Sequence, residues 1–389
     1  MNNSPGKLLI RDARIVLPDR IVEDGTILIE GEHIGSVGEG PTELRADVET
    51  LSARGLTVLP GFIDVHIHGA VGVDVMEASA DGLNEISAYL ATQGVTGWLA
   101  TLVPGSDENY ASVSAAVGKS MNHSEGARVL GIHYEGPYVN SAQCGALHTE
   151  FFKTYTSPQD LDSLPVPDNA VRMITMAPEV GGGVELIREL KRRGWVISIG
   201  HTRADLNLLD DACAAGARHM THFMNAMAPL HHRRPGPIAW GLSRDDVTVD
   251  MIADGIHLDP FMLRLLVKFK GANNISLISD AIAAAGKGDG DYQIWGETIT
   301  VKNRRTANAA GSIAGSVISM LDAVTLLHSL GVSYTDLAQM ASSNPAKLLG
   351  LDHDCGSIEV GKRADLVALD QHGQVKLTLI GGRSVPNPH

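Results

Sequence analysis

Short apolar runs that end in polar residues alternate with amphipathic stretches through the middle of this chain. Eight runs are candidate strands, at residues 62–68, 97–102, 128–134, 172–177, 195–200, 219–222, 247–252 and 275–279. Helical patterns between or after them cover residues 81–93, 108–122, 183–193, 203–214, 260–270, 316–329 and 334–349. Strands that alternate with helices are typical of an α/β fold with a parallel sheet, and eight strands over roughly 250 residues predict a closed (β/α)8 TIM-like barrel.

A doubly wound sheet is the competing arrangement. However, no GxGxxG segment opens a helix after the first strand, and no GxxxxGK[ST] loop occurs. No motif therefore supports a nucleotide-binding site of the usual kinds, and the barrel is preferred.

Both ends of the chain consist of short β-rich runs separated by turn residues, for example at 26–30 and 375–380. This pattern predicts one small β-sandwich domain formed by both termini, from residues 1–59 and 357–389. The barrel would then occupy residues 60–356.

Composition and charge exclude several classes of protein. A chain that is 44% hydrophobic and 20% charged can bury a core and is not disordered. Its net charge of −14 argues against nucleic acid and anionic membranes as partners. No signal peptide or membrane-spanning run is expected. The three cysteines, Cys144, Cys213 and Cys355, are too few and too far apart for a disulfide framework, which predicts a reducing, cytoplasmic location.

Two histidines end the first barrel strand, in the segment PGFIDVHIHG at residues 60–69. Residues two apart on a strand point to the same side, so His66 and His68 project together. Two converging imidazoles suit a divalent cation of intermediate softness. The alternative is that backbone carbonyls accept hydrogen bonds from both rings.

Other predicted strands end in the same way, with Glu135, His201, His222 and Asp280. In a (β/α)8 barrel these strand ends share one face, where the active sites of this fold lie. We therefore expect the first three, with the histidine pair, to be metal ligands, and Asp280 to be the catalytic base. Asp280 could instead be an inert ligand or the N-cap of the turn that follows it.

Segments along nearly the whole chain resemble the N-acetylglucosamine-6-phosphate deacetylases, which are metal-dependent amidohydrolases. The matching segments are PGFIDVHIHG (60–69), GIHYEGPYVN (131–140), GHT (200–202), THFMNAM (221–227), RRPG (233–236), DGIHL (254–258), SDAIAAAG (279–286), AGS (314–316), SSNPAKLLGL (342–351) and GKRADLVALD (361–370). The first and the last are common across the superfamily, whereas EGPY and THFMNAM are specific to the deacetylases.

The resemblance implies hydrolysis of the acetamide of N-acetyl-D-glucosamine 6-phosphate to D-glucosamine 6-phosphate and acetate, in amino-sugar catabolism. It implies one or two divalent metal ions per subunit, with Zn²⁺ expected. Glu135, His201 and His222 match the principal metal site, and His66 and His68 match a second one that only some members have. It also implies a homodimer, because an arginine can be donated across the subunit interface in this family.

Further residues match substrate contacts of the family. Asn225 and Ala226 match residues that contact the sugar phosphate, and Arg233 and His257 match the phosphate-binding pair. Ile313 belongs to a loop that would shape the sugar pocket.

The chain departs from the family pattern after EGP. A GAH segment is usual there, and its histidine contacts the substrate near the scissile amide. Here Leu147 stands at that position and His148 follows it. Either His148 takes the role after a shift of one residue, or another group does. Cys144, on the same loop, is explained most simply as a small side chain in a turn.

Three functions stay open at this point. The first is the deacetylase, with a small amino-sugar phosphate as partner and no nucleic acid or membrane. The second is an amidohydrolase for N-acetylgalactosamine 6-phosphate, a cyclic amide or a nucleobase. Members that bridge two metals with a carboxylated lysine are disfavoured, because no candidate strand end carries lysine. The third is a non-catalytic barrel, which the ligand set and Asp280 disfavour.

Overall fold

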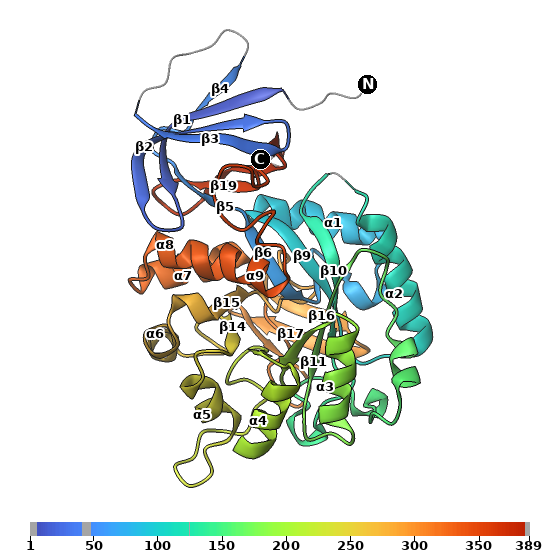
Figure 1. The fold of residues 1–389 in the computed structure, drawn as a ribbon. Coiled ribbons are helices and arrows are strands. Elements are labelled where there is room, and N and C mark those ends of the chain that lie inside the picture. The colour runs from blue at the N-terminus through green and yellow to red at the C-terminus, as the bar shows by residue number, and fades with distance from the viewer. Residues whose placement is uncertain (1–5, 41–47, 124, 386–389) are drawn as a thin grey trace.

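The computed structural model describes residues 6–40, 48–123 and 125–385. Eight parallel strands form the predicted barrel (Figure 1), in the order β6 (Phe62–Ile67), β9 (Val95–Leu102), β10 (Arg128–Glu135), β11 (Val171–Met176), β12 (Val196–Ile199), β13 (His219–Met220), β14 (Thr248–Ile252) and β15 (Ile275–Ile278). The ring closes just beyond β15, where the Asp280 N–H donates to the His66 carbonyl at 2.9 Å and Ala281 pairs with Ile67. The (β/α)8 fold is confirmed.

Helices surround the barrel at the predicted places. They are α1 (Ala80–Thr92), α2 (Asp107–Ser120), α3 (Gly183–Arg192), α4 (Leu206–Ala215), α5 (Gly236–Ser243), α6 (Pro260–Lys270), α7 (Met320–Ser329), α8 (Tyr334–Ala338) and α9 (Asn344–Leu348), with a π-helical turn at Gln339–Ser343. Short 3-10 turns occupy Val75–Glu77, Ser141–Gln143, Thr149–Phe151, Pro158–Ser163 and Ala272–Asn274. The sequence did not predict α5, which is short and begins with Gly-Pro. In the described part of the chain, no helix has the length and apolar character needed to cross a membrane.

The two ends of the chain together build one separate β domain, as expected. Its strands are β1 (Lys7–Val16), β2 (Ile21–Glu30), β3 (His33–Glu39), β4 (Glu49–Ser52), β5 (Thr57–Pro60), β19 (Leu366–Leu369), β20 (Val375–Ile380) and β21 (Arg383–Ser384). The ends meet where β19 pairs antiparallel with β5. All eight strands are joined by hydrogen bonds into one sheet that branches at β1, with a hydrophobic core of its own. The exact domain boundaries stay a prediction.

This arrangement fixes the position of the candidate site. β6 begins directly after β5, so the amino ends of the barrel strands face the terminal sheet. The carboxyl ends, which carry the candidate site residues, therefore face away from it (Figure 1). All residues of β6, β9 and β15 are buried, as expected for strands covered on both faces.

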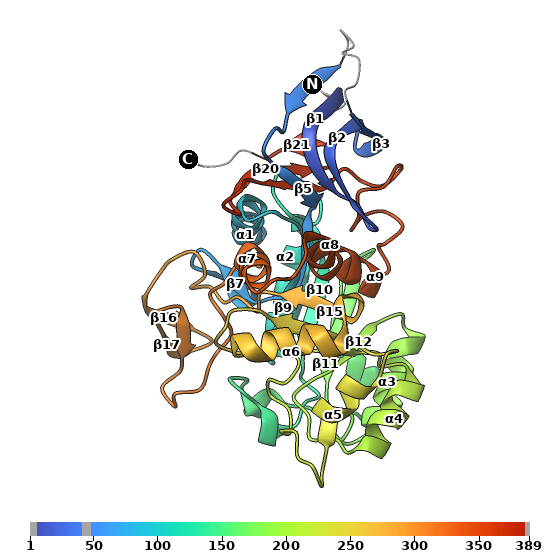
Figure 2. The ribbon, with the colours of Figure 1, turned by 90° about the vertical axis from the view of Figure 1, so that its left-hand side faces the viewer.

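An antiparallel sheet that the sequence did not predict projects from the barrel after β15. It consists of β16 (Gly290–Ile294), β17 (Glu297–Lys302) and β18 (Arg305–Ala307), and it lies at the edge of the molecule in Figure 2. Ile294, Ile299 and Val301 pack in a small core of their own with residues that follow β15. A two-stranded ribbon of β7 (Gly69–Ala70) and β8 (Val73–Asp74) lies directly after β6.

Candidate metal centre

Six side chains meet at the carboxyl ends of the barrel strands. His66 lies in β6 with His68 just beyond it, and Glu135 is the last residue of β10. The other three are His201, His222 and Asp280, each two residues past the end of its strand. All six are buried, with at most 7% of any residue exposed.

The three residues that follow strands share an unusual backbone conformation. The φ angles of His201, His222 and Asp280 are +48°, +29° and +51°. Residues other than glycine rarely adopt this left-handed backbone conformation, and residues in strained conformations cluster at functional sites. The turn lets each side chain reach across the top of the barrel.

The first group of candidate ligands consists of Glu135, His201 and His222. The Oε1 atom of Glu135 lies 2.9 Å from His201 Nε2 and 3.0 Å from His222 Nε2, and the two nitrogens are 3.1 Å apart. A tetrahedral zinc site with ligand distances of ~2.0–2.1 Å has edges of about 3.3 Å. The three atoms are therefore within a few tenths of an ångström of that arrangement.

The hydrogen-bond partners of His201 support a cation at this point. Its Nδ1 lies 2.7 Å from the Gln143 carbonyl oxygen, which can only accept, so we assign the proton to Nδ1. In the neutral ring, the Nε2 atom then directs a lone pair at the carboxylate of Glu135, which also only accepts. A bound cation satisfies both atoms, and the carbonyl contact is the kind that orients a histidine ligand.

The second group consists of His66, His68 and Asp280. The two Nε2 atoms are 3.0 Å apart and lie 3.4 and 3.2 Å from Asp280 Oδ1. The Nδ1 atoms of both rings are buried without a hydrogen-bond partner among the described residues. The interpretation with backbone carbonyls as partners of both rings therefore has no support in these contacts.

Glu135 connects the two groups. Its Oε1 faces the first group, and its Oε2 lies 3.4 Å from His68 Nε2. Burial alone would raise the pKa of Glu135, but the charge of His66 and the bonds from the first group outweigh burial and hold this pKa well below its usual value. Burial likewise opposes ionisation of Asp280, but the imidazoles of the second group lower its pKa. Both carboxylates are thus ionised and available to a cation.

Two further buried histidines in the barrel have structural partners. The His133 ring lies 3.0 Å from the Val65 carbonyl oxygen and 2.8 Å from Thr175 Oγ1. Burial lowers the pKa of His133 well below its usual value, so this ring is neutral. His219 Nδ1 lies 2.7 Å from Thr248 Oγ1. Neither belongs to a group of candidate ligands among the described residues.

The residues expected to contact the sugar lie on the turn after β13. Asn225 donates from Nδ2 to the His222 carbonyl at 3.2 Å, and Ala226 has a φ of +48°. Ile313 is half-buried in the loop after β18. That loop is anchored to the site, because the Ser316 N–H donates to the Asp280 carbonyl at 2.7 Å.

Each residue of the expected phosphate-binding pair has a hydrogen-bond partner other than its pair-mate. His257 follows β14 and its Nδ1 is 2.7 Å from Asp254 Oδ2. Arg233 is exposed on the loop before α5, and its guanidinium is 2.9 Å from His232 Nε2. No hydrogen bond or ion pair joins Arg233 to His257 in the parts of the chain that the structure describes.

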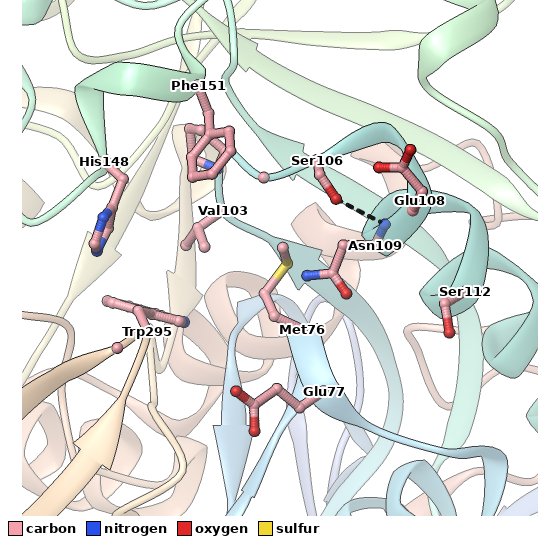
Figure 3. Close-up of a pocket in the computed structure, with 13 residues that line it drawn as sticks. Met76, Glu77, Val103, Ser106, Glu108, Asn109, Ser112, His148, Phe151 and Trp295 are labelled. Carbon is pink, nitrogen blue, oxygen red and sulfur yellow. Dashed lines mark hydrogen bonds between the residues drawn. The ribbon is translucent and has the colours of Figure 1, made fainter.

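His148 lies on the wall of a cavity of about 480 Å³ rather than in either group of candidate ligands (Figure 3). Its Nδ1 is 3.2 Å from Glu150 Oε1, and Leu147 beside it is buried. Trp295 lines the same cavity, and its ring packs edge-on against that of His68 at 5.2 Å. Trp295 was not among the expected site residues, because the sequence did not predict the hairpin that carries it.

The sequence profile of the amidohydrolase family matches residues 57–385. The chain belongs to the amidohydrolase family, and within it to the N-acetylglucosamine-6-phosphate deacetylases. An enzyme of that name from Bacillus subtilis is 37% identical over 384 residues, covering 96% of each chain. A solved structure of N-acetyl-D-glucosamine-6-phosphate deacetylase from Mycobacterium smegmatis, a mutant in complex with N-acetyl-D-glucosamine-6-phosphate, has a TM-score of 0.89 at 30% identity, covering 98% of this chain and 100% of that one.

One relative of this amidohydrolase carries a different substrate in its name. The N-acetylgalactosamine-6-phosphate deacetylase of Escherichia coli O157:H7 is 32% identical over 378 residues, covering 96% of this chain and 98% of that protein. Amidohydrolases of this family are metal-dependent, and the two groups of candidate ligands fit that property.

Proposed function

We propose that this amidohydrolase removes the acetyl group of N-acetyl-D-glucosamine 6-phosphate and releases acetate and D-glucosamine 6-phosphate. The observation that carries the proposal is the shared Glu135 carboxylate between two groups of imidazoles, with Asp280 beside it on the rim. The names of the relatives reported above indicate the substrate. The cyclic amides and nucleobases considered from the sequence have no comparable support.

In this reaction the residues of the chain have separate tasks. Glu135, His201 and His222 would hold a divalent cation, and His66 and His68 a second one where present. When bound, the cation lowers the pKa of an attacking water from ~15.7 to about 7 and polarises the amide carbonyl.

Proton transfer is the task of Asp280. Its Oδ1 faces the imidazoles of the second group. Among the described residues, the ion pairs of Asp280 involve Oδ1 and leave Oδ2 available for a proton. Asp280 takes a proton from the attacking water and returns it to the amine nitrogen as the C–N bond breaks. The buried position excludes bulk water from this exchange.

We further propose that the metal is Zn²⁺, because imidazole nitrogens with a carboxylate oxygen are a ligand set that zinc prefers. The group of Glu135, His201 and His222 is the principal site, since its three ligand atoms lie closest together. We place the protein in the cytoplasm, which agrees with free thiols at Cys144 and Cys213.

A homodimer would complete the phosphate site. Arg233 is exposed on the loop before α5, as expected if it serves the active site of a second subunit. Arginine binds phosphate oxygens with two parallel hydrogen bonds, so this contact would favour the 6-phosphate over the free sugar.

The test is acetate release by purified protein reconstituted with Zn²⁺. We expect turnover of N-acetyl-D-glucosamine 6-phosphate and a far lower rate on free N-acetylglucosamine. N-acetyl-D-galactosamine 6-phosphate serves as the second candidate, because one relative carries that name. A higher kcat/KM on the galactosamine epimer would reverse the substrate assignment, and no acetate release from either would refute the deacetylase.

A further inference from the structure

The cavity beside the metal centre has no task in the reaction described so far. It lies at the carboxyl end of β9, where Val103 lines it, and Figure 3 shows His148 and Trp295 on one side of it and the start of α2 on the other. Met76, Val103 and Phe151 give the space between them an apolar wall. A cavity of about 480 Å³ is large enough for several carbon atoms.

Trp295 stands between this cavity and the metal centre. Its indole lines the cavity and also packs edge-on against the ring of His68, with centroids 5.2 Å apart and an interplanar angle of 85°. Trp295 and Gly296 form the two-residue turn between β16 and β17, with φ angles of +54° and +75°. Such turns favour Asn, Asp or Gly, and a bulky residue there is strained. A strained tryptophan that contacts a candidate metal ligand indicates a specific role.

The strand order shows which part of the substrate faces this cavity. In the closed ring, β9 lies four strands from β13 in either direction, so the two are opposite each other. Asn225 and Ala226, the expected sugar contacts, follow β13. In an amide, the acyl substituent and the nitrogen substituent lie on opposite sides of the carbonyl carbon. With the sugar toward β13 and the carbonyl at the metal centre, the acyl group points toward β9 and the cavity at its carboxyl end.

We propose that Trp295 is a specificity-determining residue that limits the acyl group to acetyl. Without its indole, the cavity becomes continuous with the metal centre and receives longer acyl chains. The reaction is the same hydrolysis: water adds its oxygen to the carbonyl carbon, the C–N bond breaks, the nitrogen gains a proton, and butyrate leaves in place of acetate. The proposal rests on the proposed function and concerns the acyl end of the same site.

The experiment compares N-acetyl- and N-butyryl-D-glucosamine 6-phosphate as substrates of the zinc-loaded protein. We expect the wild type to prefer acetyl by about 100-fold or more in kcat/KM, and Trp295→Ala to lower that preference at least ~10-fold, since one methylene in a closed pocket changes discrimination by ~10–200-fold. The ratio of the two rates is independent of the fraction of folded enzyme. Trp295→Leu should give an intermediate ratio. Phe151→Ala is the matched control, because it enlarges the cavity while Trp295 still separates it from the metal centre, and it should leave the ratio unchanged.

Binding to metal-depleted protein gives a second readout. Isothermal titration calorimetry with N-butyryl-D-glucosamine 6-phosphate should give a Kd at least ~10-fold lower for Trp295→Ala than for the wild type. An unchanged rate ratio in both Trp295 variants would overturn the proposal, as would an equal change in Phe151→Ala or loss of both activities in the two Trp295 variants. Failure of the wild type to release acetate would instead refute the proposed function.

Discussion

Replacing Asp280 with asparagine tests the assignment of the catalytic base. The amide keeps the shape of the side chain and an oxygen that can face His66 and His68, now 3.4 and 3.2 Å from Oδ1. It cannot accept a proton at neutral pH. Glu135 is a poor substitute, because its two oxygens already face the imidazoles of both groups. A lost general base lowers turnover by ~10²–10⁴-fold, which is about 2.7–5.4 kcal/mol of the barrier.

The assay measures kcat for acetate release, metal content and substrate binding of the same preparation. Asp280→Asn should retain metal at Glu135, His201 and His222, and its Kd for the substrate should change little. Asp64→Asn is the matched control, because Asp64 is buried in β6 and accepts from Ser279 Oγ at 2.5 Å without joining either ligand group. We expect less than a ~10-fold loss there. Turnover of Asp280→Asn near that of the wild type, with metal bound, would refute the base assignment.

Two other predictions concern metal and stability. His201→Ala should remove most of the bound metal and nearly all activity, because a site with three protein ligands has no spare one; full metal content by elemental analysis would contradict the ligand assignment. Asp365→Ala should lower the free energy of unfolding by roughly 3–5 kcal/mol. The buried Asp365 carboxylate pairs with Arg128 at 2.9 Å and with Arg363 at 3.2 Å, and the substitution would leave both guanidiniums without this partner. Denaturant unfolding measures this loss, and a change below ~1 kcal/mol, as expected for an exposed pair, would contradict the argument.

Much of the barrel follows from local sequence patterns. Buried parallel strands appear in a sequence as apolar runs. All eight predicted runs contain a strand of the barrel, and they could be recognised because each is short and flanked by turn residues or helical periodicity. The sheet at residues 290–307 was missed, although Ile294, Ile299 and Val301 alternate with exposed residues. Its strands are short, and their apolar side chains are buried by residues that follow β15, which a local pattern does not reveal.

The candidate site was predictable by residue type but not by geometry. Polar residues at strand ends indicated the six side chains, because a barrel brings those ends to one face. Their division into two groups through Glu135 depends on atom positions, as does the left-handed backbone of His201 and His222. Trp295 could not be found from spacing, since its contact with His68 depends on how the hairpin folds back.

The exposed position of Arg233 leads to a prediction about the assembly. If each active site takes its arginine from the partner and its Asp280 from its own chain, then Arg233→Ala and Asp280→Asn protomers should complement each other. A mixed dimer has one site with both residues intact and one site with neither. After subunit exchange in a 1:1 mixture, half of the dimers are mixed, so about a quarter of all sites regain wild-type activity, provided that the dimer is symmetric and exchange is random. The rate of acetate release in the mixture, compared with the two separate variants, measures this recovery. No recovery, although exchange is demonstrated with tagged subunits, would mean that Arg233 acts within its own chain or does not bind the substrate.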